Sequence, residues 1–541
     1  MKKYLLLLIL ALASFVAIHA QPIAVPIPTD TTSKLEILPG SGRYTYNKID
    51  SVTTIVSLAA RARIKQDKTL IEADSAVINL NTKIMEAFGN VHINDSDTLD
   101  TYSQYIKYFG KERKAHLTKS VRLTDSKGGV LLTDDLDYDM STRVATYSKG
   151  GKVLNKTTVL KSKEGTYFGD SKDVIFRKDV VLIDPEYKLI ADSLLYNTGT
   201  EIARFICPTT IIAKGGRRIY TRDGFYNLRT GEAYFGKRAT IVDSTQSIVA
   251  DKSAIDDKTG IAQFEGNVIY KDTIQGVTIL TNKLNVDRKN GIFLATEHPV
   301  MILKQDNDSL YITGDTLYSG RLTQRMKIKD VPVIVDTSKV PMPMLDLEGK
   351  DSTKNRFFEA FHHVKIFSDS MQAVCDSMFY SSVDSAFRLY TKPILWANNS
   401  QITGDTIYLF TKNKKAERLY AYDNGFIINR IRPNFYNQVK GRTVNAIFFD
   451  GNIDYVRTKG NAESVYYAQD EKEKFVGMNK ATADAIDMYF KNKAAHRVVF
   501  RKDLKGTTYP MRGISLADSQ LAGFNWQDDK RPKTKFDLFG N

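Results

Sequence analysis

The sequence contains few of the residues on which disulfides, metal sites and enzyme chemistry most often depend. Its 541 residues include two cysteines, two tryptophans and seven histidines. Cys207 and Cys375 are separated by several copies of the repeat described below, and strands stacked about 4.8 Å apart would hold them more than roughly 20 Å apart. A disulfide needs Cα atoms within about 7 Å of each other. We therefore expect two unpaired thiols.

Short catalytic and metal-binding motifs are also missing. The sequence has no nucleophile elbow, phosphate loop, paired Cys-x-x-Cys or His-Glu-x-x-His segment. His362 and His363 form the only histidine pair, and adjacent residues on a strand point to opposite faces, so the two would not easily share a metal ion. We expect no catalytic residue, no metal site and no cofactor.

Long apolar runs and helical periodicity are scarce as well. One apolar run, residues 4–18, follows Lys2 and Lys3 and precedes Ala20, which predicts a cleavable secretory signal peptide over residues 1–20. An uncleaved membrane anchor is the alternative, although the run is short for a bilayer span. Almost no later segment has the 3.6-residue period of an amphipathic helix.

One motif of about thirty residues, by contrast, returns along most of the chain. Copies begin at Glu72 (EADSAVINLNTKIMEAFGNVHIND), Ala191 (ADSLLYNTGTEIARFICPTTIIA) and Ala250 (ADKSAIDDKTGIAQFEGNVIYKD). Each copy opens with a small residue and an acid, which start a short alternating strand. A polar turn follows, and a second alternating strand ends the copy. A fixed period of this kind indicates a stacked repeat architecture.

The acidic residue, which we call the anchor, aligns the copies. Most neighbouring anchors lie 26 to 34 residues apart. Two residues after the anchor, ten of eleven copies have an apolar or aromatic residue, and four residues after it eight copies do. Since side chains alternate faces along a strand, each copy has one apolar and one polar face. The anchors are Asp74, Asp100, Asp134, Asp192, Asp223, Asp251, Asn282, Asp315, Asp376, Asp405 and Asp484.

Strands with one apolar face must bury that face against one another. We therefore predict an all-β fold, an elongated repetitive β-jelly roll or β-solenoid. The predicted segments are a leader and N-terminal capping strand over residues 21–60, repeats over 61–319, an insertion or hinge loop over 320–355, further repeats over 356–510 and a loose C-terminal tail over 511–541.

The recurring acid and the net charge each have a functional and a structural interpretation. A polysaccharide-cleaving β-solenoid would need several carboxylates in one cleft, whereas one acid per copy produces a ladder, so we interpret the anchor as a structural residue at a strand start. The formal net charge of +15 suggests an acidic partner such as an anionic lipid, polysaccharide or surface. A solvated basic outer face is the alternative, and export argues against nucleic acid.

The repeat resembles that of the OstA family, the organic solvent tolerance proteins of the LptA/OstA type that transport lipopolysaccharide in the periplasm. ADSLLYN at Ala191, AFGNVHI at Ala87 and AQFEGNVIY at Ala262 carry the resemblance best, and it extends over roughly residues 60–510. The resemblance implies a twisted β-jelly roll, open along one side, whose apolar interior holds the acyl chains of lipopolysaccharide.

The resemblance further implies a non-enzymatic transport protein that binds lipopolysaccharide or lipid A in the periplasm, in association with the outer membrane. Exposed end strands would stack on other lipopolysaccharide-transport components. The alternative is a secreted structural β-roll, a scaffold or adhesin with a closed core. The inward-facing residues predicted to line a lipid groove are Leu136, Tyr138, Leu194, Tyr196, Phe225, Ile255, Leu284, Val286, Leu317, Met378, Ile407 and Ile486.

Overall fold

The all-β prediction is confirmed by the structure of the chain, a computed structural model. The structure describes residues 34–95, 99–126, 128–304, 309–322, 355–412, 415–449, 452–470, 474–491 and 494–539. The predicted signal peptide and nearly all of the predicted insertion at 320–355 lie outside these residues. None of the described residues forms a helix with the length and hydropathy that a transmembrane span requires.

The chain divides into two compact units. The first comprises residues up to 126 together with 134–143, and the second comprises 127–133 and 144–541. The division thus falls within one predicted array of repeats, and strand pairing continues across residues 320–355. The strands of the first unit are β1 Glu36–Ile37, β2 Arg43–Lys48, β3 Thr54–Gln66, β4 Thr69–Asn79, β5 Ile84–Asp95, β6 Leu99–Phe109, β7 Lys114–Asp125 and most of β8 Val130–Asp139.

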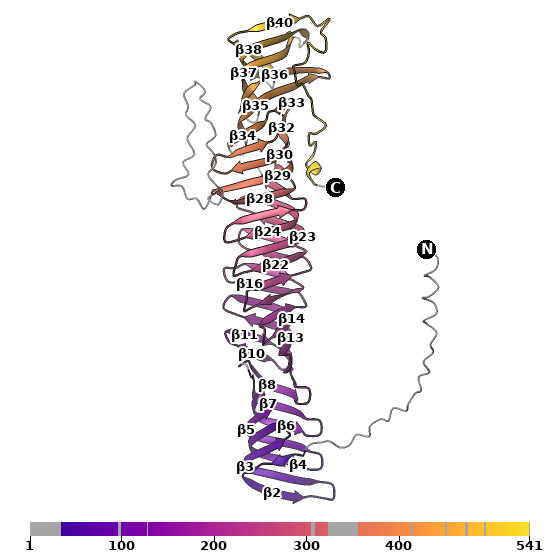
Figure 1. Ribbon diagram of the computed structural model, residues 1–541. Coiled ribbons are helices and arrows are strands. Elements are labelled where there is room, and N and C mark those ends of the chain that lie inside the picture. Colours follow the sequence, from indigo (N-terminus) through magenta and orange to yellow (C-terminus); the bar gives the residue numbers. More distant parts are fainter. Residues whose placement is uncertain are drawn as a thin grey trace, which may run out of the picture. The chain divides into compact units, whose positions relative to one another are not determined.

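The second unit contains the start of β8 and the remaining strands, labelled in part in Figure 1. These are β9 Val144–Tyr147, β10 Gly151–Asn155, β11 Thr158–Ser162, β12 Glu164–Phe168, β13 Asp173–Ile183, β14 Tyr187–Asn197, β15 Ile202–Phe205, β16 Thr209–Ala213, β17 Arg218–Thr221, β18 Gly224–Asn227, β19 Glu232–Phe235, β20 Ala239–Val242, β21 Gln246–Ala250, β22 Lys252–Asp256, β23 Ile261–Asp272, β24 Val277–Asp287, β25 Ile292–Thr296, β26 Val300–Lys304, β27 Ser309–Thr313, β28 Thr316–Arg321, β29 Arg356–Phe367, β30 Met371–Ser381, β31 Ala386–Tyr390, β32 Ile394–Ala397, β33 Ser400–Thr403, β34 Thr406–Lys412, β35 Lys415–Arg432, β36 Phe435–Phe449, β37 Asn452–Gln469, β38 Phe475–Lys491, β39 Ala494–Arg501 and β40 Lys505–Tyr509, followed by the short 3-10 helix η2 Lys535–Leu538.

Long strands bend once, and the two halves pair with different neighbours. In β13, for example, residues 173–177 pair with β12 and residues 181–183 pair with β11, with an irregularity between Arg177 and Val180. The half strands therefore build two arms. In the second unit, arm A contains β10, β11, β16, β17, β20, β21, β26, β27, β32, β33 and β40, and arm B contains β9, β12, β15, β18, β19, β22, β25, β28, β31, β34 and β39.

The first unit repeats this plan. Residues 62–66 of β3, 69–73 of β4 and 91–95 of β5 belong to arm A, whereas residues 54–59, 75–79 and 84–88 of the same strands belong to arm B.

At most bends of both units, one strand has two consecutive residues with positive φ. These pairs are Ala60–Arg61, Gly89–Asn90, Lys119–Ser120, Lys178–Asp179, Lys237–Arg238, Gly266–Asn267, Glu297–His298, His362–His363, Thr391–Lys392, Asp423–Asn424, Gly460–Asn461 and Lys502–Asp503.

In most copies the anchor acid lies on the strand that faces this pair, but Asp100 lies in arm A, where it contacts His92 and Asn94. Asp74 Oδ2 accepts a hydrogen bond from Asn90 Nδ2 at 3.0 Å, and Asp251 Oδ2 accepts one from Asn267 Nδ2 at 2.8 Å. Non-glycine residues with positive φ cost roughly 1 kcal/mol or more each, so such a bend persists only where neighbouring bonds hold it. The recurring acid is therefore a structural residue of the bend.

The histidine pair occupies one of these bends. His362 Nδ1 lies 3.3 Å from Asp376 Oδ1, whereas His363 Nδ1 lies 3.0 Å from Asp315 Oδ2. Each imidazole thus contacts a different anchor.

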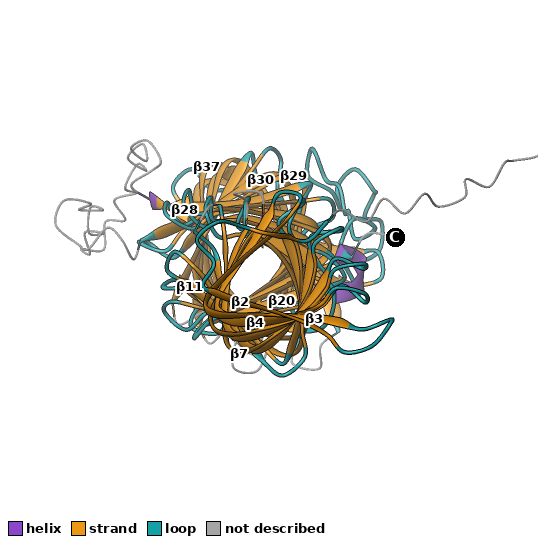
Figure 2. Ribbon diagram, turned by 90° about the horizontal axis from the view of Figure 1, so that it is seen from below, coloured by secondary structure: helices purple, strands orange, loops and turns teal. Residues whose placement is uncertain are grey.

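The C-terminal segment 511–539, which we call the strap, returns along the outer face of arm A (Figure 1, yellow). Leu521 is buried in a cluster with Phe426, Ile428, Val465, Tyr467 and Met478. At its far end, η2 contacts β27 and β29 and lies outside the strand layers (Figure 2). The expectation of a loose tail is wrong for these residues.

Three glutamines in one outward row of arm A hold the strap. Gln438 Nε2 donates to Ser519 O and its Oε1 accepts from Leu521 N, at 2.8 and 2.9 Å. Gln401 bonds Asn525 O and Gln527 N in the same way, both at 2.8 Å. Gln372 Oε1 accepts from Arg531 Nε at 2.7 Å. Each of the first two amides thus pairs with an extended backbone as a neighbouring strand would.

Shortening Leu521 tests the strap. We expect Leu521→Ala to lower the free energy of unfolding of this region by about 2–4 kcal/mol, because it leaves a cavity among buried side chains. Tryptophan fluorescence during urea unfolding measures the change, since Trp396 lies in the glutamine row and Trp526 lies on the strap. Leu516→Ala is the control, because Leu516 is 73% exposed, and it should stay within about 0.5 kcal/mol of the native protein.

The two cysteines are both free thiols in different environments. Cys375 is buried in β30, and burial raises the pKa of its thiol to about 12. Cys207 is half-buried, and its Sγ donates to Ser193 O at 3.1 Å.

Because the thiolate is the reactive form, we expect a maleimide at neutral pH to label Cys207 in the folded protein and to leave Cys375 unmodified. Mass spectrometry after a timed reaction counts the labels. The variant Cys207→Ser should then remain unlabelled until denaturant is added, and rapid labelling of that variant would contradict the buried placement of Cys375.

Candidate functional site

Two inward rows of arm B side chains define the interior of the second unit. The deep row, next to the bend, runs in register through Leu194, Phe205, Gly224, Phe235, Ser253, Phe264, Leu284, Ala295, Leu317, Ala360, Met378, Leu389 and Ile407. The mouth row, nearer the turns, runs through Tyr196, Ala203, Tyr226, Ala233, Ile255, Ala262, Val286, Phe293, Ser319, Phe358, Tyr380 and Phe387.

Eleven of the twelve predicted groove residues face inward. Leu194, Leu284, Leu317, Met378 and Ile407 lie in the deep row. Ile486 continues this row in β38 through register partners in β35, β36 and β37. Tyr196, Ile255 and Val286 lie in the mouth row. Leu136 and Tyr138 occupy equivalent buried positions in β8 of the first unit. Whether they contact lipid remains a proposal.

Phe225 is the exception, and its predicted inward orientation is wrong. In β18 it is Gly224 that pairs with Phe205, the same residue that pairs with Leu194 on the other side. Gly224 therefore occupies the deep-row position, and the anchor position falls on Arg222. Phe225 thus points outward, while Tyr226 points inward and is 4% exposed. A Cβ on Gly224 would approach Tyr234 O to 2.0 Å, which explains why no side chain is present there.

Polar side chains join the two arms across the mouth of the interior. In the first unit, Tyr108 OH donates to Gln66 Oε1, and Tyr138 OH donates to Asp95 Oδ2 at 2.7 Å. In the second unit, Asn155 Nδ2 donates to Tyr196 OH at 3.1 Å. Burial raises the pKa of Tyr108 and of Tyr196 to about 12, so both hydroxyls stay protonated. A tyrosine of the mouth row thus closes the interior at each of these levels.

This tyrosine is lost over three successive copies of the repeat. The equivalent residues, four positions after the anchor, are Ile255, Val286 and Ser319. All three line a cavity of about 600 Å³. Tyr270, on arm A, hydrogen bonds within its own arm, to Asp272 Oδ2 at 3.4 Å. The cavity therefore lies along the copies in which a shorter residue replaces this tyrosine, although Phe293, Phe358 and Tyr380 of the mouth row also line it.

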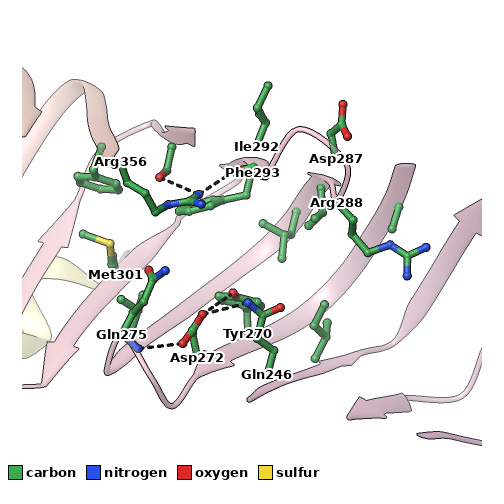
Figure 3. Close-up of a pocket in the computed structure, with 18 of the residues that line it drawn as sticks. Gln246, Tyr270, Asp272, Gln275, Asp287, Arg288, Ile292, Phe293, Met301 and Arg356 are labelled. Carbon is green, nitrogen blue, oxygen red and sulfur yellow. Dashed lines mark hydrogen bonds between the residues drawn. The ribbon is translucent and has the colours of Figure 1, made fainter. Parts of the chain in front are cut away.

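The cavity has apolar walls and a polar rim. Both arms supply walls, which include Ile241, Ile248, Phe264, Leu284, Phe293 and Met301. The rim is formed by turns at the ends of both arms and holds Gln246, Asp272, Gln275, Asp287 and Arg288 (Figure 3). Apolar walls with a few convergent polar groups are typical of ligand sites.

An ion-pair cluster lies beside the cavity and includes two of its lining residues, Arg217 and Arg288. Asp257, in the turn after β22, accepts from Arg217 Nη2 at 2.8 and 3.0 Å, from Arg288 Nη2 at 2.6 Å and from Tyr187 OH at 2.9 Å. Arg217 and Tyr187 belong to arm A, whereas Asp257 and Arg288 belong to arm B. The carboxylate therefore holds the two arms together beside the cavity, and we call this cluster the Asp257 latch.

We expect Asp257→Asn to lower the free energy of unfolding of the second unit by about 1–3 kcal/mol. The reason is that Arg217, whose side chain is 17% exposed, would lose its charged partner. Thermal unfolding followed by circular dichroism measures this loss. Glu186→Gln is the matched control, because Glu186 pairs with Lys214 while 55% exposed, and it should change the value by no more than about 1 kcal/mol.

Comparisons with known proteins agree with this architecture. Residues 43–192 match the family of OstA-like proteins, and residues 247–415 match the family described as LptA/(LptD N-terminal domain) LPS transport protein. The second match contains most of the cavity-lining residues and spans residues 320–355.

Among solved structures, the chain is similar to LptH, the LptA homologous periplasmic component of the conserved lipopolysaccharide transport device from Pseudomonas aeruginosa. The identity is 16%, the match covers 25% of this chain and 74% of that chain, and the TM-score is 0.17. No curated protein matches the sequence. The chain thus contains an OstA-like segment at residues 43–192 and a lipopolysaccharide-transport segment of the LptA/LptD N-terminal type at residues 247–415.

Proposed function

We propose that this protein binds lipopolysaccharide in the periplasm, holds its acyl chains in the cavity of the second unit, and contributes to outer-membrane assembly as a non-enzymatic transport protein. The observation that carries the proposal is the cavity, which has apolar walls and is lined mostly by residues of the segment that matches a lipopolysaccharide-transport family. Each methylene group buried there would contribute about 0.8 kcal/mol. Such contacts have little directionality and therefore allow a chain to slide.

The proposal places the acyl chains at fewer positions than the repeat alone would. Of the twelve groove candidates, Ile255, Leu284 and Val286 line the cavity. Leu136, Leu194 and Ile407 are fully buried and support the core. The alternative function, a structural roll with a closed core, fits the part of the chain within residues 66–201, because tyrosine bridges close the mouth there. A roll that is closed at one level and open at another fits a carrier with a defined binding site.

The proposal includes assembly with other transport components, and the strands at the two ends of the chain provide free edges for it. Within the described residues β2 pairs with β3 alone, and all six of its residues are exposed. β40, in the second unit, pairs with β38 alone. Such strand edges can accept a strand from a partner.

Restoring the missing tyrosine tests the lipid site. We expect Val286→Tyr to reduce lipopolysaccharide that copurifies with the protein about tenfold, because the larger side chain occupies the cavity. The measurement is quantitative mass spectrometry of lipid extracted from protein purified from its native envelope. Ile190→Tyr is the control, since Ile190 lies on the outer face and is 41% exposed, and it should leave the lipid content unchanged.

Native protein that carries no lipid, and that forms no crosslink to added lipopolysaccharide from a photoreactive residue at position 255, would refute the transport proposal. The closed-core alternative would then be favoured. An unchanged melting temperature for Val286→Tyr must accompany the loss of lipid, so that the loss is not caused by unfolding.

A further inference from the structure

The outer face of arm B has a surplus of positive charge at the last levels of the second unit. Three outward rows cross β35, β36, β37, β38 and β39 in register, and we call their fifteen residues, five of them basic and one acidic, the basic face. The rows are, from the bend toward the turns, Tyr422, Thr443, Lys459, Ala485 and Arg501, then Tyr420, Asn445, Arg457, Asp487 and Val499, then Arg418, Ile447, Tyr455, Tyr489 and Arg497.

The acid of the basic face lies beneath the bases. Asp487 is 0% exposed. It accepts hydrogen bonds from Arg457 Nε at 2.7 Å, from Arg501 Nε at 2.5 Å and from Tyr455 OH at 2.9 Å. One carboxylate thus serves two guanidiniums, and the side chain of Arg501 remains 50% exposed. Asp487 orients the arginines from below, while their surplus charge faces outward.

Two further arginines of the basic face contact neutral groups. Arg418 Nε donates to Asn445 Oδ1 at 3.0 Å. The guanidinium of Arg497, which is exposed, lies 5.2 Å from the centre of the Tyr489 ring. Neither arginine forms an ion pair with a carboxylate of the described residues.

Earlier levels of arm B show a different balance on the same outward face. Lys107 pairs with its register partner Glu86 at 3.2 Å, and Lys283 pairs with its register partner Glu265 at 3.5 Å. At those levels a base faces an acid on the next strand, whereas the basic face has five bases for one acid.

The acids that border the basic face do not remove its surplus charge. Glu417 pairs with Lys412 at 3.5 Å, and Asp423 pairs with Arg442 at 3.2 Å. Asp454 is exposed at the bulge of β37, outside the three rows.

Exposed apolar side chains lie beside these arginines. Ile447 is 39% exposed, and Phe449, two residues further along β36 and therefore on the same side, is 77% exposed. The rings of Tyr455 and Tyr489 lie next to them, with centroids 5.1 Å apart. Exposed apolar groups with a polar rim mark interaction surfaces, and tyrosine is enriched where proteins meet lipid head groups.

We infer that the basic face docks on the surface of a bilayer that contains anionic phospholipids. Five strands make this face about 19 Å wide, which suits an extended charged surface better than one small anion. The arginines bind lipid phosphates through paired hydrogen bonds, and Ile447 and Phe449 enter the boundary between head groups and acyl chains. The inference goes beyond the proposed function, because it uses the outer face of arm B and not the cavity.

Cosedimentation with vesicles tests this docking. The protein is residues 21–541, since the apolar run of the predicted signal peptide would itself bind lipid. One set of vesicles is phosphatidylcholine, and the other is equal parts of phosphatidylcholine and phosphatidylglycerol. We expect binding to the anionic vesicles alone, weakened by added salt.

The double variant Arg418→Gln/Arg497→Gln should weaken binding to anionic vesicles about tenfold to thirtyfold, because it removes two charges that face the membrane. Its melting temperature should be unchanged, since neither arginine bonds Asp487. Arg204→Gln/Lys283→Gln is the matched control, because it removes two charges from outward positions of arm B at other levels. Native affinity of the folded first variant, or equal loss in both variants, would overturn the docking face.

Val286→Tyr separates docking on a bilayer from capture of single lipids by the cavity. We expect this variant to bind anionic vesicles as the native protein does, because Val286 lines the cavity. Loss of vesicle binding would place the contact in the cavity and refute the docking face. Conversely, native protein that copurifies with lipid but ignores anionic vesicles refutes the docking face and leaves the proposed function intact.

Phe449→Ser separates a bilayer from a soluble acidic polymer. We expect it to weaken vesicle binding about fivefold, because an apolar side chain is lost from the contact. Soluble polygalacturonate should not displace the native protein from the vesicles. Displacement by this polymer, together with native affinity of Phe449→Ser, would assign the basic face to an acidic polysaccharide and overturn the inference.

Discussion

The bend that divides each long strand into two halves is the constraint on which the rest of the structure depends. Two consecutive residues with positive φ turn one strand, and the anchor acid on its neighbour bonds the turned segment, as Asp74 does with Asn90 and Asp251 with Asn267. Without this bend the strands would form one flat layer whose apolar face would be exposed. With it, each strand contributes to both arms, and the space between them can be filled or left open at each level of the stack.

The residue in the mouth row decides between these two states. At several levels a tyrosine at this position reaches the opposite arm and closes the interior, as Tyr138 does with Asp95 and Tyr196 with Asn155. Isoleucine, valine and serine are shorter, and Ile255, Val286 and Ser319 line the cavity together with Phe293 and Tyr380 of the same row. The deep row is mostly apolar and buried, with Ser253 as a buried polar member. Core formation and access to the interior are thus controlled by different residues of one strand, two positions apart.

The regular part of this architecture was predictable because side-chain alternation and the anchor fix the inward face. Leu194, Leu284 and Leu317 follow directly from that pattern. Phe225 does not, since the acid in its copy moved by one residue and a one-residue shift exchanges the two faces of a strand. The cavity could not be located by hydrophobicity, because tyrosine, isoleucine and valine all count as inward residues. What distinguishes these residues is the length of the side chain, which decides whether it can bond the opposite arm. This difference can be interpreted only once the hydrogen bonds across the mouth are known.

The strap was missed for a related reason. Trp396, Val465 and Met478 lie on the outward face of arm A, where the repeat predicts polar residues, and their apolar character is meaningful only with a segment to cover them. In a stacked array each level is stabilised mainly by its neighbours, so a cavity weakens packing locally. The strap bonds Gln372, Gln401 and Gln438, and its end contacts β27 and β29 close to the cavity walls. Packing on the outer face can thereby support the levels whose interior is left open for a ligand.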